Sequence, residues 1–94
     1  MQETITRKIF GQAISYQLQI EECQRNQYQI YLSCLQPRLY QQMLGSSPAL
    51  LQNQLVTIVK DAAYKFTTQI EFQEPFFIDC SQNEVCLQAR FSTR

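Results

Sequence analysis

The chain has 94 residues, of which 16 are glutamine and none is histidine or tryptophan. Its eight basic and eight acidic residues give a formal net charge of zero, so it lacks the positive field that draws proteins to nucleic acids and other polyanions. Without histidine it cannot build a Ser-His or Cys-His pair, which excludes the most common forms of nucleophilic catalysis.

Length and composition indicate a single domain over residues 1–94. Apolar residues make up 45% of the chain, close to the globular average of about 45–50%. The glutamines are interleaved with Ile, Leu, Tyr and Phe, which argues against a disordered glutamine-rich tract. Residues 1–10, which include Ile5, Ile9 and Phe10, are expected to form an N-terminal arm or an extra strand.

Residues 13–35 carry the clearest pattern of the chain. Apolar and polar residues alternate over 14–20 and again over 28–34, as in strands with one wet face. A three-residue loop, 24–26, would join the strands, with Asn26 in the left-handed conformation. The predicted antiparallel hairpin pairs Tyr16 with Cys34, Leu18 with Leu32, Ile20 with Ile30, and Cys23 with Gln27.

Two helices are expected to follow this hairpin. Pro37 suits the first turn of a short helix, which carries Leu39 and Met43 and ends at Gly45. Pro48 opens the main helix, over residues 48–66. The apolar stripe of that helix, which should lie on the sheet, comprises Leu51, Leu55, Ile58, Val59, Ala62 and Phe66.

From Thr67 the alternation of period two returns and predicts three more strands. The first carries Ile70 and Phe72 between Gln69, Glu71 and Gln73, and the other two lie over residues 76–80 and 85–91. The first of the three should stop near Pro75. A loop over 81–84 would pair Cys80 with Val85. The fold class is therefore α+β: an antiparallel sheet made of a β-hairpin and three later strands, with the short and the main helix packed on one face.

The four cysteines are expected to be free thiols. The registers place Cys23 on the wet face and Cys34 on the dry face, and Cys80 inward and Cys86 outward, so neither pair can bond. We expect no metal site, because there is no C-x-x-C spacing and no histidine, and no cofactor. No apolar leader and no apolar run of about 20 residues is present, so we expect a cytoplasmic protein without a membrane span.

The surface composition favours a protein–protein interaction domain. Interfaces are depleted in Lys, Glu and Asp and enriched in aromatic residues, and glutamine makes polar contacts without the desolvation cost of a charge. We expect a non-enzymatic adaptor, regulator or chaperone-like accessory protein that forms a homodimer and binds a further protein. The candidate partner-binding residues are Gln17, Gln19, Gln29, Tyr31, Leu35 and Phe77.

Alternative interpretations stay open. The same glutamine and aromatic face resembles, in its physics, the stacking platforms that bind single-stranded nucleic acid, although the basic residues are scattered and balanced by acids. A small-ligand-binding domain is the second alternative. The outward aromatic side chains would also be explained if the N-terminal arm or the short helix covered them.

Overall fold

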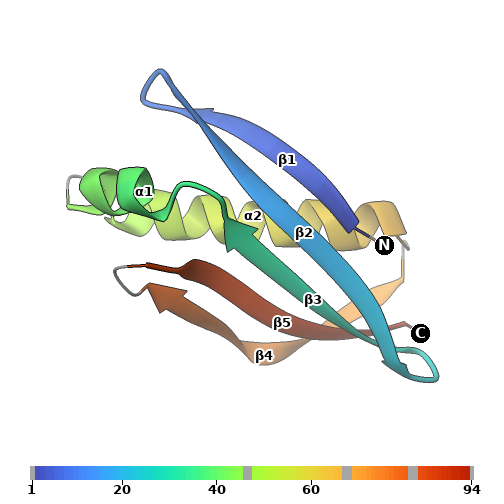
Figure 1. Cartoon of the computed structure of the whole chain (residues 1–94). Coiled ribbons are helices and arrows are strands. Elements are labelled where there is room, and N and C mark those ends of the chain that lie inside the picture. Colours follow the sequence, from blue (N-terminus) through green and yellow to red (C-terminus); the bar gives the residue numbers. More distant parts are fainter. Residues whose placement is uncertain (1, 46–47, 67–68, 81–82, 94) are drawn as a thin grey trace.

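The computed structural model describes residues 2–45, 48–66, 69–80 and 83–93, without the side chains of Leu44, Phe66, Glu74 and Pro75. In this part of the chain five antiparallel strands form one sheet in the order β1-β2-β3-β5-β4, and two helices cover one face of it (Figure 1). The α+β class is confirmed. The elements are β1 Gln2–Ile9, β2 Gln12–Gln24, β3 Gln27–Cys34, α1 Pro37–Leu44, α2 Pro48–Phe66, β4 Ile70–Cys80 and β5 Val85–Thr93.

The hairpin of β2 and β3 has the predicted register over most of its length, which confirms three of its four predicted pairs: Tyr16 with Cys34, Leu18 with Leu32, and Ile20 with Ile30. The fourth pair is wrong, because Gln24 faces Gln27 and Cys23 is the extra residue of a bulge. Asn26 has a φ of 62°, the left-handed conformation expected of it. Asparagine tolerates this conformation because its short polar side chain can hydrogen-bond locally.

The N-terminal residues form a strand of the sheet, so the arm is ruled out for residues 2–9. Strand β1 pairs with β2 along its whole length without a register shift. Phe10 and Gly11 form the turn between the two strands, with φ values of 51° and 79°. Positive φ at both central residues belongs to the mirror-image turn whose twist matches that of the strands.

The helices begin and end as predicted, and they pack on the inner face of the sheet. Helix α1 is followed by Gly45, and α2 lies over β3 and β5. Every member of the predicted stripe whose side chain is described is buried; the side chain of Phe66 lies outside the described residues. Ala63, which was not assigned to the stripe, is buried as well.

Aromatic rings join the two halves of the sheet on its inner face. The ring of Phe91 in β5 stacks on Tyr28 of β3, with centroids 5.3 Å apart. Phe91 also lies 5.8 Å from the ring of Phe72 in β4, which in turn lies 5.3 Å from Phe76. Such pairs stabilise by about 0.5–1.5 kcal/mol beyond the area that they bury.

The strand expected to stop near Pro75 does not stop. The predicted strand that carries Ile70 and Phe72 and the predicted strand over 76–80 are one strand, β4, with a register shift against β5 between Gln73 and Phe77. Proline lacks the N–H that an inner strand needs, but it is tolerated at an edge or a bulge. Because β4 is an edge strand, Pro75 interrupts the pairing without ending the strand. The predicted pairing of Cys80 with Val85 is confirmed.

The backbone of Phe10 generates a prediction about stability. A left-handed conformation costs an ordinary residue about 1–2 kcal/mol. The ring of Phe10 is 60% exposed, so its packing contributes little stability to offset that cost. We expect Phe10→Asn to raise the free energy of unfolding by about 1 kcal/mol, measured by chemical denaturation. Phe10→Ala is the control, since it removes the ring but not the backbone cost. Equal stability of the two variants would contradict a backbone origin.

Candidate functional site

The face of the sheet opposite the helices is the candidate site. In the view of Figure 1 the strands lie in front and the helices behind, and nothing in the described part of the chain crosses the front face. The registers align the outward side chains of neighbouring strands into rows. One row runs across all five strands, in the order Gln2, Gln19, Tyr31, Gln88 and Phe77.

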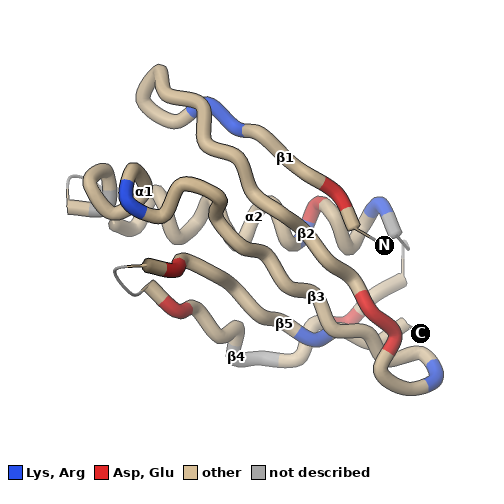
Figure 2. Tube along the Cα trace, viewed as in Figure 1, with Lys and Arg blue, Asp and Glu red and all other residues tan. Residues whose placement is uncertain are grey.

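Two further rows flank this central row. On one side lie Thr4, Gln17, Ser33, Cys86 and Asp79. On the other side lie Glu21, Gln29, Arg90 and Gln73. The central row carries no charge, and Figure 2 shows the charged residues of β1 to β5 toward the ends of the strands and the turns. The open face therefore has a neutral, amide-rich centre and a charged periphery.

The structure places five of the six predicted residues on this face. Gln17, Gln19, Gln29 and Tyr31 are half-buried among their neighbours, and Phe77 is 65% exposed at the end of the central row. A hollow of about 190 Å³ lies among Gln19, Glu21, Gln29 and Tyr31. The face thus offers both a protruding aromatic ring and a recess.

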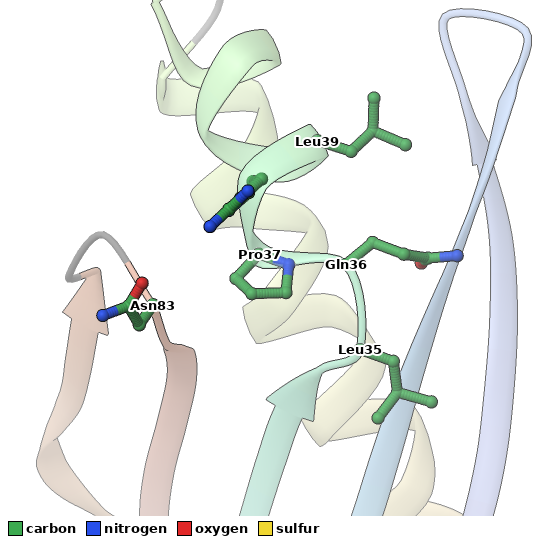
Figure 3. A pocket seen from close by; sticks show the side chains of 6 residues that line it. Leu35, Gln36, Pro37, Leu39 and Asn83 are labelled. Carbon is green, nitrogen blue, oxygen red and sulfur yellow. The ribbon is translucent and has the colours of Figure 1, made fainter.

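Leu35 lies apart from the other five. It follows the end of β3, where its N–H donates to the carbonyl oxygen of Ser15 at 2.9 Å. It lines a different hollow of about 440 Å³, together with the first residues of α1 and with Asn83. In Figure 3 Leu35, Gln36 and Leu39 extend away from Asn83, so this hollow is wide and shallow. Its volume falls within the range of ligand pockets, but most of its lining residues are exposed.

Tyr31 is held in place by a residue that sequence reasoning missed. Its hydroxyl donates to Oε1 of Glu84 at 2.8 Å. This bond to a carboxylate, and then partial burial, raise the pKa of Tyr31, so the phenol stays neutral and keeps the proton that it donates. Gln88 was missed as well, although its outward position follows from the alternation in β5. Its place between Tyr31 and Phe77 depends on the pairing of β3 with β5, which no local pattern signals.

Cys80 and Cys86 point as predicted, inward and outward, but their exposure does not follow from their direction. Cys80 is exposed, because it ends the edge strand β4, and Cys86 is buried although it lies on the open face. The side chain of Tyr31 lies against Cys86 and, with the neighbouring strands, covers it. Burial raises the pKa of the Cys86 thiol, which keeps it protonated. Cys23 is exposed and Cys34 buried, as predicted.

Among the described residues no cluster of three or more His, Cys, Asp or Glu side chains is placed to hold a metal ion. No helix in the same part of the chain is long and apolar enough to cross a membrane. Comparison with known proteins adds nothing further, since no family model, no curated protein and no solved structure matches this chain.

The four thiols should differ in reactivity in the folded protein. All four are free. Cys23 should react first with a chromogenic disulfide reagent. Cys80 should follow more slowly at neutral pH, because burial and the nearby Asp79 raise its pKa and the thiolate is the reactive form; raising the pH should speed it. Cys34 and Cys86 should react only on unfolding.

Counting thiols in denaturant without reductant provides the control. Four thiols are expected in freshly purified protein. A count of two or fewer would mean that disulfides form and that the hairpin registers are wrong.

Proposed function

We propose that this chain is a small, non-enzymatic protein–protein interaction domain of the cytoplasm. It acts as an adaptor, regulator or chaperone-like accessory protein, associates with itself, and takes a further protein on its open face. The observation that carries the proposal is the uncharged row across five strands, which ends in the 65% exposed ring of Phe77.

The open face has the composition of an interface. Interfaces combine a core depleted in charge with a polar rim, and the rows on this face have that arrangement. The glutamine amides of the central row donate and accept hydrogen bonds, so they can pair with a partner's backbone without desolvating a charge. Burying the exposed ring of Phe77 would supply about 1.5–3 kcal/mol.

Single-stranded nucleic acid is the second candidate, because Tyr31 and Phe77 stand on an open sheet face as stacking rings do. Electrostatics weigh against it. In the described part of the chain, the basic residues whose strand positions point to this face are Lys8 and Arg90. The acidic residues Glu21 and Asp79 point to the same face and offset their positive charge. Such a platform must also neutralise phosphates.

Substitution of Phe77 tests the proposed function. The wild-type protein, Phe77→Ala and Leu50→Ala serve as baits in native lysate, with and without nuclease, and the captured protein is then purified for titration. We expect Phe77→Ala to weaken its binding by about 1–3 kcal/mol, as loss of a buried aromatic anchor does. Leu50→Ala is the matched control, since Leu50 is 46% exposed but lies on α2.

Salt and nuclease separate the two candidates. A protein partner on a neutral face should bind almost equally at low and moderate salt and should survive nuclease. If nuclease abolishes the capture, and if the affinity falls steeply as the salt concentration is raised, the result would favour nucleic acid as the partner. A lower melting temperature for Phe77→Ala with unchanged capture would contradict the assignment of Phe77 to an interface.

A further inference from the structure

Strand β1 forms an edge of the sheet that is regular along its whole length. It pairs with β2 on its inner side, over residues 2–9, without a bulge. On its outer side no strand of the described residues pairs with it. It contains neither proline nor glycine. An edge of this kind presents backbone donors and acceptors to any strand that can align with it.

The β1–β2 turn shows which backbone groups point outward. Ile9 faces Gln12 across the two-residue turn, and residues that flank such a turn exchange both backbone hydrogen bonds. Because backbone direction alternates along a strand, the N–H and C=O groups of odd-numbered residues point to β2, and those of even-numbered residues point to solvent. Nη1 of Arg7 donates to the carbonyl oxygen of Thr6 at 3.2 Å, which agrees, since that carbonyl is free to accept. The outward-directed residues are Gln2, Thr4, Thr6 and Lys8.

We propose that two copies of this chain pair β1 with β1, antiparallel, about a two-fold axis at Ile5, and so join their sheets into one. The inference rests on the proposed self-association and specifies its surface. Thr4 then faces Thr6 of the second copy, and their outward N–H and C=O groups form the ladder. Glu3 faces Arg7 of the second copy, and by symmetry Arg7 faces its Glu3.

Charge complementarity selects this register. A two-fold axis perpendicular to the sheet keeps the helical layers of both copies on the same side of the joined sheet. Residues that face each other across the two strands point to the same side, so odd-numbered residues must face odd-numbered ones, and the two residue numbers have an even sum. An axis at Thr4 would set Glu3 against Ile5 and leave Arg7 without an acid on the facing strand, with Asp61 of its own α2 in the same groove. An axis at Thr6 would set Ile5 against Arg7. Only the axis at Ile5 sets Glu3 of one copy against Arg7 of the other. The same axis sets Ile5 against Ile5 of the second copy.

The side chains involved lie where cross-strand contact is closest. Glu3, Ile5 and Arg7 occupy positions that would not be hydrogen-bonded in the new pair, where facing side chains approach most nearly. Ile5 is half-buried and packs on the core. It borders a groove of about 180 Å³ between β1 and α2 that has Ile58 and Ala62 in its lining. Pairing would cover the exposed remainder of Ile5.

The opposite edge of the sheet does not offer the same surface. Strand β4 has a register shift between Gln73 and Phe77, and Pro75 lacks an N–H. Residues 70–80 contain three acids and no Lys or Arg, so β4 pairing with itself would bring like charges together. Self-complementarity therefore belongs to β1, and the occupant it fits is a second copy.

Charge reversal on the full chain tests the register. Sedimentation equilibrium at low salt should give a wild-type mass near twice 11.1 kDa. Glu3→Arg and Arg7→Glu should each raise the dissociation constant about tenfold or more, because each creates two like-charge contacts. The double variant Glu3→Arg/Arg7→Glu should return to within about threefold of wild type, since the opposite charges are restored.

Two further variants act as controls. Glu22→Arg makes the same charge change at an exposed position at the far end of β2, and it should leave the dissociation constant unchanged. Thr4→Pro removes an outward N–H without removing a β1–β2 hydrogen bond, so it should abolish the dimer while circular dichroism retains the folded spectrum.

The outcomes separate this inference from the proposed function. Failure of the double variant to recover would overturn the register. A dimer insensitive to all β1 variants but lost in Phe77→Ala would overturn the edge and leave self-association through the open face standing. A monomeric wild type would overturn both self-association and the edge, while capture of a partner that depends on Phe77 would still support the interaction function.

Discussion

The pairing of β3 with β5 is the contact on which the rest of this structure depends. It joins the two halves of the sheet, which are separated in the chain by the entire helical layer. The β4–β5 half is a two-stranded hairpin, and such hairpins are at best marginally stable alone in water, so this half would not persist without the junction. Helix α2 covers it from the inner side, and the stacked rings of Tyr28 and Phe91 bridge it.

The same junction assembles the open face. Tyr31 comes from β3, whereas Gln88, Phe77 and Glu84 come from beyond α2, and only the junction brings them together. The helices cover one face of the sheet, so these side chains have no covering layer in the described part of the chain. Glutamine suits that position, because an uncharged amide remains solvated when the face is free and loses little when a partner covers it.

The two edges of the sheet are protected to different degrees. Edge strands in natural proteins are interrupted or charged against unwanted pairing, and β4 has both features in Pro75 and its acidic residues. Strand β1 has no interruption, and its charges are of both signs. In the proposed pairing, this difference would make β4 repel its own copy and β1 complement its own copy.

Local pattern alone determined much of this protein. Alternation of period two and a helical stripe yielded the β2–β3 hairpin, both helices and the pairing of Cys80 with Val85, because these depend on neighbouring residues and on turn chemistry at Asn26. It also showed which positions face outward, including Tyr31 and Phe77. Local pattern failed where tertiary context overrides it, as at Pro75, which an edge strand tolerates.

Only the tertiary structure decided which outward residues share a surface. The sequence contains no signal for the β3–β5 register, because contacts between residues more than 50 positions apart, such as Tyr31 and Glu84, leave no periodicity within either strand. For the same reason the alternation predicted the directions of Cys80 and Cys86 but not their exposures. Alternation shows which way a side chain points, whereas burial depends on what other elements place over it, and that is a property of the assembled sheet.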